Sequence, residues 1–240
     1  MIDLLLLLLI LVVVPLHAVA EGRRVRRSLD EGGSDTRLAA YGRIIAWQWG
    51  AAAVLGVVWV LTGRSVALLG IAVPTGLGFL IAAVLALVAI GLLAFQSRAV
   101  RTRTDLQEQV RTAAAPLRWL LPATPPEMRR FTWVGLTAGT VEELVYRGYM
   151  MWLLAQFAPM WVALGGSALA FGIAHSYQGL GGFAKTAAVG LGLGGLYWLS
   201  GSLWVPMILH ASFDVLQGRM LYDVIRRPAG EAAAVPPRSG

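Results

Sequence analysis

Long apolar runs, separated by short arginine-rich segments, organise this sequence. A helix needs about 20 apolar residues to cross the hydrocarbon core of a bilayer. Seven runs approach that pattern: residues 2–20, 44–61, 77–95, 131–157, 161–175, 186–199 and 203–220. The fifth and sixth are short or glycine-rich. The pattern predicts an all-α integral membrane protein with about seven transmembrane helices.

Composition supports this class and excludes several others. Hydrophobic residues make up 57% of the chain and charged residues 14%, whereas about a quarter of a soluble domain is charged. The absence of cysteine excludes disulfides, thiolate metal sites and cysteine nucleophiles. The net charge of +7 comes from bases that lie between the apolar runs. The expected partner is therefore a lipid bilayer, and no nucleic acid is expected.

Basic residues also predict the orientation in the membrane. Arginines are concentrated after the first, third and seventh runs, and basic loops stay in the cytoplasm. Seven spans then place the N-terminus outside and the C-terminus inside. Ala18-Val19-Ala20 resembles a signal cleavage site, but the bases follow the apolar run and Asp3 precedes it. This order favours an uncleaved anchor in a multi-pass protein.

The runs divide the chain into four regions. We expect an N-terminal three-helix membrane region (residues 1–96), a cytoplasmic segment with an amphipathic helix and a proline-broken linker (97–130), a helical core (131–222) and a disordered tail (223–240). Residues 66–73 are a short apolar piece, expected to be a loop or partly inserted. The tail is rich in Ala and Pro, a composition that does not build a core.

Ionisable residues are concentrated in the last four runs. Each costs a few kcal/mol inside a bilayer, so such residues suggest function. The first three runs contain only Asp3 and His17, both near run ends, whereas the later runs contain the candidates. These are Glu142, Glu143, Arg147, His175, His210, Asp214 and Arg219. The sequence therefore predicts a polar site inside the C-terminal four-helix region.

Glu142 and Glu143 are the first two of these ionisable residues. Glu143 and Arg147 are four residues apart, so they share a helix face and can pair. Glu142 points about 100° away on an α-helix and has no adjacent cation, which suits a general base. A packing salt bridge with a spare carboxylate is the alternative.

Two histidines complete the candidate chemistry. Phe171 lies one turn before His175, so its ring can pack over the imidazole. His210 and Asp214 also share a face. They could ligate a metal, or His210 could donate to an oxyanion while Asp214 fixes its tautomer.

Metal dependence stays open at this level. The sequence has no H-E-x-x-H motif. Glu142, His175 and His210 could nevertheless hold zinc from three helices and leave a position for water. The same groups could instead work without metal, with Glu142 and His175 polarising water directly.

Three motifs in order resemble those of the CPBP intramembrane protease family, which includes CAAX prenyl endopeptidases and bacterial Abi-type proteins. They are E-E-x-x-x-R at 142–147, F-x-x-x-H at 171–175 and H-x-x-x-D at 210–214. The resemblance spans residues 131–220. The third motif commonly ends in Asn, and Asp214 adds a negative charge.

The resemblance implies a role for each matched residue. Glu142 would be the main catalytic carboxylate, His175 would help it activate water, and His210 and Asp214 would stabilise the tetrahedral intermediate or help hold a metal. Glu143, Arg147 and Phe171 would support them. The expected activity is hydrolysis of a peptide bond in a membrane-associated or lipidated protein, in a bacterial plasma membrane.

Two other functions compete with the protease. A non-catalytic scaffold, or a bacteriocin-immunity or regulatory protein of the same family, would use the polar groups as a structural network. A transporter would use them as proton relays. Transporters usually contain inverted repeats or paired broken helices, and the first three runs have no counterparts to the acidic groups.

Overall fold

The computed structural model describes residues 2–31, 36–71 and 76–226, and these residues are entirely helical or in connecting turns, without strands. The N-terminal helices are α1 (Ile2–Leu8), a π-helical turn (Leu9–Val13), α2 (Val14–Asp30), α3 (Thr36–Leu61), a 3-10 turn (Val66–Leu69), α4 (Leu77–Thr102), α5 (Thr104–Ala114) and a second 3-10 turn (Ala115–Leu117). The C-terminal helices are α6 (Pro125–Glu143), a π-helical segment (Leu144–Met150), α7 (Met151–Leu154), α8 (Met160–Ala174), a third 3-10 turn (Ser176–Gln178), α9 (Gly179–Ser200) and α10 (Trp204–Arg226). The all-α prediction is confirmed.

Three helical rods have the length and hydropathy to cross a membrane: Ile2–Asp30, Arg37–Leu61 and Leu77–Thr102. They correspond to the first three apolar runs. Many large apolar side chains on them are exposed, including Leu77 and Leu87 of α4. Such a surface suits contact with lipid chains, so the protein is an integral membrane protein.

The C-terminal helices are shorter or less apolar. α8 has 15 residues, a length of about 22 Å at 1.5 Å per residue. α6 is followed by a π-helical segment, and its end contains the two adjacent glutamates. α8 is apolar but short, α9 is rich in glycine, and α6 and α10 contain ionisable residues that suggested a site.

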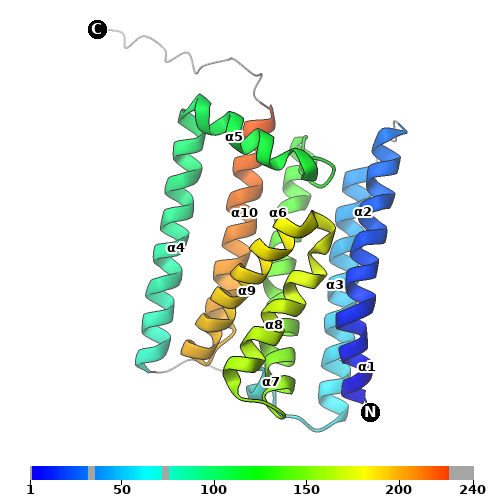
Figure 1. The fold of residues 1–240 in the computed structure, drawn as a ribbon, viewed down its shortest axis with the longest axis vertical. Helices are drawn as coiled ribbons and strands as arrows, with labels where there is room; N and C mark the ends of the chain where they lie inside the picture. Colours follow the sequence, from blue (N-terminus) through cyan, green and yellow to red (C-terminus); the bar gives the residue numbers. More distant parts are fainter. Residues whose placement is uncertain (1, 32–35, 72–75, 227–240) are drawn as a thin grey trace.

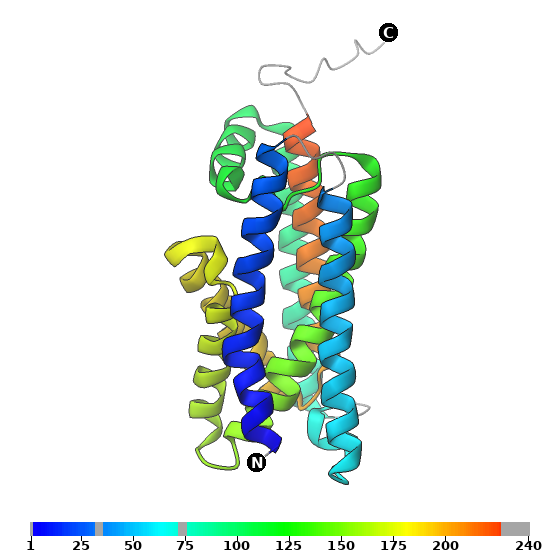
Figure 2. The same cartoon turned by 90° about the vertical axis from the view of Figure 1, so that its right-hand side faces the viewer.

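The N-terminal helices enclose the C-terminal ones from two sides. α3 packs on α6, whereas α4 packs on α10 and α9. Figure 1 shows α4 at one edge of the bundle and α1–α3 at the other, with α6 and α10 between them. In Figure 2 the α8–α9 pair forms a separate layer beside α1 and α2. The N-terminal helices therefore supply walls for the polar site.

Helices cross the expected region boundaries in three places. α6 already begins at Pro125, within the segment expected to be a proline-broken linker. α4 continues to Thr102, and α5 forms a separate helix where an amphipathic one was expected. α10 extends to Arg226, so residues 223–226, assigned to the tail, are helical. The expected disorder of the remaining tail concerns residues 227–240, which lie outside the described residues.

Polar contacts near its N-terminus attach the first helix to the core, at the end of the bundle opposite the arginine-rich segments. Arg64 donates two hydrogen bonds to the Asp3 carboxylate, at 2.8 and 2.6 Å. The Tyr149 hydroxyl donates to the same carboxylate at 3.1 Å. The Arg64 guanidinium also lies over the rings of Trp59 and Trp152. These contacts hold α1 beside the π-helical segment that follows α6.

Candidate functional site

The site begins where α6 changes from α- to π-helix. Glu142 and Glu143 end α6, and Arg147 lies within the π-helical segment Leu144–Met150. Such π-helical turns are rare and often occur at functional sites. The two glutamates point in different directions, one to the packed interior and one to a cavity.

Glu143 is in the interior. The Arg147 guanidinium donates to its Oε1 at 2.8 Å, and both side chains are fully buried. This confirms the pair expected from the four-residue spacing. Arg147 also donates to the Gly190 carbonyl of α9 at 3.1 Å, and its guanidinium lies over the Phe171 ring. The pair thus links α6 to α8 and α9.

His210 of α10 joins the same carboxylate. Its Nδ1 lies 2.7 Å from Oε1 of Glu143. Because an ionised carboxylate only accepts, Nδ1 carries the proton and Nε2 faces the site. Asp214 lies on the other side, with Oδ2 3.7 Å from Nε2. The expectation that Asp214 fixes the tautomer of His210 was wrong, because Glu143 occupies Nδ1.

His175 lies just beyond the C-terminal end of α8. Its Nδ1 lies 2.8 Å from the Phe171 carbonyl oxygen, which can only accept, so Nδ1 is the donor. The Phe171 ring packs on the imidazole with centroids 4.5 Å apart, as the spacing predicted. The Phe171 ring also meets His210 edge-on. One phenylalanine therefore orients both imidazoles.

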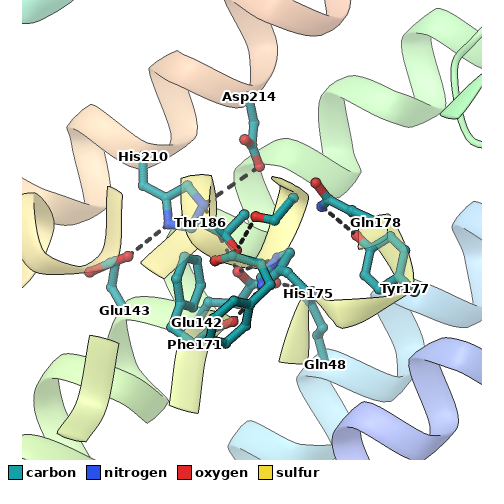
Figure 3. A network of polar contacts seen from close by, with 12 residues as sticks. Gln48, Glu142, Glu143, Phe171, His175, Tyr177, Gln178, Thr186, His210 and Asp214 are labelled. Atoms are coloured by element: carbon teal, nitrogen blue, oxygen red, sulfur yellow. Dashed lines mark hydrogen bonds and ion pairs between the residues drawn. The ribbon is translucent and has the colours of Figure 1, made fainter. Parts of the chain in front are cut away.

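The two imidazoles converge on Glu142. Its Oε2 lies 3.9 Å from Nε2 of His175 and 3.9 Å from Nε2 of His210. Among the residues that the structure describes, this buried oxygen has no hydrogen-bond partner. Figure 3 shows Glu142, His175, His210 and Asp214 facing a common centre. The four candidate catalytic residues therefore come from three helix ends or faces and meet at one point.

Two glycines of α6 allow this convergence. A Cβ at Gly139 would lie 2.5 Å from the backbone nitrogen of Ala211, next to His210. A Cβ at Gly135 would lie 3.0 Å from Cβ of Asp214. Small residues let helices approach closely in membranes. Because neither glycine has a side chain, α10 can lie close enough to α6 for His210 to reach Glu143.

A cavity of about 170 Å³ adjoins Glu142 and His175. Since water occupies about 30 Å³ per molecule in the liquid, the cavity has room for several. It runs along the first helix from Leu6 to Val25, and its lining is mainly apolar. Its described lining includes Glu142 and His175 but neither His210 nor Asp214. Of the four residues, Glu142 and His175 therefore line the cavity, whereas His210 and Asp214 lie outside its lining.

The candidate ligands for a metal ion are Glu142, His175 and His210. Among the described residues, no group of three His, Asp or Glu side chains has the arrangement to hold a metal ion. Glu142, His175 and His210 are close but stand 3.9 Å apart in the two pairs that involve Glu142. The geometry therefore gives no positive support to the zinc alternative, and the mechanism proposed below uses protein groups alone.

One residue of the site was not expected from the sequence. Gln48 of α3 donates from Nε2 to Oε1 of Glu142 at 2.9 Å. A single amide within the apolar run 44–61 was the available signal. Because an amide carries no charge, the distribution of ionisable residues does not reveal it.

A carboxylate and two imidazoles inside an apolar helical bundle define the class as a membrane-embedded protein with a hydrolase-like polar site. Residues 124–216 match the family model of type II CAAX prenyl endopeptidase Rce1-like proteins. This match contains all three motifs and confirms the resemblance seen in the sequence. Members of that family are intramembrane proteases, which supports a hydrolase of CAAX-protease type. No curated protein and no solved structure matched the chain.

Proposed function

We propose that this protein is an intramembrane endopeptidase that hydrolyses a peptide bond of a membrane-associated or lipidated protein or peptide. One observation carries the proposal. Glu142 belongs to the wall of a cavity, and its buried Oε2 is equally far from the Nε2 atoms of His175 and His210. The Nδ1 atom of each ring is held by the Phe171 carbonyl or by Glu143. A structural salt bridge alone would not leave a buried carboxylate oxygen in that position.

Glu142 and His175 together suit the activation of water. Both Oε2 of Glu142 and Nε2 of neutral His175 are acceptors. Two groups 3.9 Å apart can both lie about 2.8 Å from one water oxygen, a normal hydrogen-bond length. The water would then direct both hydrogens to the protein and a lone pair to the substrate carbonyl carbon.

The proton balance follows from this arrangement. As the water oxygen attacks the carbonyl carbon, Glu142 takes a proton and the carbonyl oxygen becomes an oxyanion. When the C–N bond breaks, protonated Glu142 gives that proton to the leaving amine. General acid–base transfer of this kind contributes about 10²- to 10⁴-fold to a rate.

His210 is the proposed stabiliser of the oxyanion. Glu143 and Arg147 hold its ring from the interior, so a proton on Nε2 would make it a fixed donor facing the site. Preorganised donors of this type act strongly where water is excluded. Asp214, 3.7 Å from the same nitrogen, would favour the doubly protonated ring.

The proposal includes a membrane arrangement with about seven spans. The arginine-bearing ends of α2, α4, α6 and α10 gather at one end of the bundle, and the N-terminus lies at the other (Figure 1). The positive-inside rule makes the first end cytoplasmic and places the N-terminus outside. Residues 131–222 would form the catalytic core, flanked by the three-helix region of residues 1–96 and the segment 97–130. The apolar cavity would admit the substrate from the membrane.

The test uses purified protein in detergent and a peptide library with and without a lipid group. We expect the wild type to cleave, and Glu142→Gln and His175→Ala to lose cleavage while keeping their thermal stability. Arg130→Gln, a surface change, serves as the matched control. Equal cleavage by all four proteins would exclude the enzyme and favour the scaffold alternative.

Metal content is measured in the same preparations. Elemental analysis of the wild type is compared with His175→Ala and His210→Ala. A stoichiometric metal that both variants lose would establish the zinc alternative and replace the metal-free step. Activity in the wild type without bound metal would support the step in which Glu142 and His175 activate water directly.

A further inference from the structure

Gln48 is a polar side chain directed at the proposed catalytic carboxylate from outside the family match. It lies in the middle of α3, among residues that are mainly apolar, whereas the match begins at residue 124. Its amide nitrogen donates to Oε1 of Glu142 at 2.9 Å. A carboxylate only accepts, so the amide nitrogen, and not the oxygen, faces Glu142.

The remaining contacts of Gln48 strengthen this assignment. Its amide oxygen is buried without a hydrogen-bond partner among the described residues. The hydrogen bond that the described residues give this amide is the one to Glu142. Gln48 also lines the cavity beside Glu142 and His175, which places the amide at the proposed site and not only at the packing contact between α3 and α6.

We propose that Gln48 is a positioning residue for Glu142. By holding Oε1, it turns Oε2 toward the imidazoles of His175 and His210. The inference rests on the proposed function for its catalytic meaning, but the hydrogen bond that fixes Oε1 can be tested without activity.

Trp49 offers a matched control on the next residue. Its indole Nε1 donates to the Thr137 hydroxyl at 3.3 Å, so it links the same two helices, α3 and α6, without touching Glu142. If Gln48 only attaches α3 to α6, Trp49→Phe and Gln48→Met should behave alike. If Gln48 positions Glu142, only Gln48→Met should change the chemistry of that carboxylate.

The first measurement is chemical labelling of Glu142 in the intact protein. Dicyclohexylcarbodiimide, an apolar reagent, modifies protonated carboxyl groups, and mass spectrometry quantifies the product. We expect Gln48→Met to increase labelling of Glu142 about tenfold, because the hydrogen bond that holds Oε1 is lost and the carboxyl group is free to reach the reagent. Trp49→Phe should label like the wild type.

A second variant guards against misfolding of the first. Gln48→Glu keeps the shape of the side chain but places a carboxyl beside Glu142. A carboxylate has no hydrogen to donate to Oε1 of Glu142, so the hydrogen bond is lost and labelling should again rise. Unchanged labelling in both folded variants, or an equal change in Trp49→Phe, would overturn the inference.

Peptide cleavage then separates this inference from the proposed function. We expect Gln48→Met to lower kcat about tenfold with KM nearly unchanged, since a hydrogen bond to a charged group contributes on this scale, and Trp49→Phe to leave both near the wild type. If the wild type cleaves no peptide, the proposed function fails, while the labelling result still decides whether Gln48 holds Oε1 of Glu142. Cleavage by Gln48→Met at the wild-type rate would overturn the positioning role and leave the protease intact.

Discussion

The regions around Glu142 and Glu143 differ although the two residues are adjacent in the sequence. The Glu143 region is closed: Oε1 accepts from Arg147 and faces Nδ1 of His210, with no exposed surface on the carboxylate. The Glu142 region is open: the residue lines a cavity, Oε1 accepts from Gln48, and the buried Oε2 faces two imidazole nitrogens. The difference supports the proposal that Glu143 builds the site and Glu142 acts in it.

The largest expected effect tests the open region. Glu142→Gln keeps the shape of the side chain but removes the base. We expect the peptide-cleavage rate to fall by about 10²- to 10⁴-fold, while the midpoint of thermal unfolding changes little. Rates are compared with those of Glu142→Asp, which keeps the charge and should retain some activity. A cleavage rate for Glu142→Gln near that of the wild type would remove the functional difference between the two regions.

The second prediction tests the closed region. Arg147→Met leaves Glu143 without its counterion inside the bundle, and breaking a buried ion pair costs about 3–5 kcal/mol. We expect a large drop in the unfolding midpoint of the protein in detergent. The double variant Arg147→Met with Glu143→Leu should recover some of it, because no buried charge then remains unpaired. A single variant as stable as the wild type would show that the pair contributes little to the fold.

A third change acts on both regions at once. Gly139→Ala would place a methyl group 2.5 Å from the backbone of Ala211. The resulting displacement of α10 should cost about 1–3 kcal/mol and lower activity, because His210 moves with that helix. Gly192→Ala on α9 is the control, since nothing lies within 4 Å of the added carbon. Equal behaviour of the two variants would show that α10 adapts freely.

The smallest effect is expected for an ion pair outside the bundle. Arg103 and Asp105 interact at 2.6 Å, but more than half of each side chain is exposed. The Arg103 guanidinium lowers the pKa of the Asp105 carboxyl from its ordinary value. Exposed pairs contribute little to stability, so Arg103→Gln should leave the unfolding midpoint unchanged. A drop like that of Arg147→Met would mean that burial does not separate the two kinds of pair.

The sequence predicted what local helix geometry determines. Four-residue spacing was enough to pair Glu143 with Arg147 and to stack Phe171 on His175. Apolar length was enough to identify the first three helical rods, because they contain few polar residues. These properties depend on one helix at a time.

Contacts between helices were harder to predict. His210 contacts Glu143 through Nδ1, whereas the spacing had offered Asp214 as one alternative for fixing its tautomer. Gly139 brings α10 close enough to α6 for this contact. The reach of Gln48 across to Glu142 depends on how α3 packs on α6. No spacing within a single helix contains that information.

The π-helical segment Leu144–Met150 has a consequence for register. Its wider turn accommodates an extra residue relative to an α-helix. Regular α-helical bonding through the same residues would instead rotate everything beyond the segment by about 100° relative to the two glutamates. Tyr149 would then turn away from Asp3, to which it now donates at 3.1 Å. The segment thus sets the phase between the carboxylates and the anchorage of the first helix, whose side chains form a cavity wall.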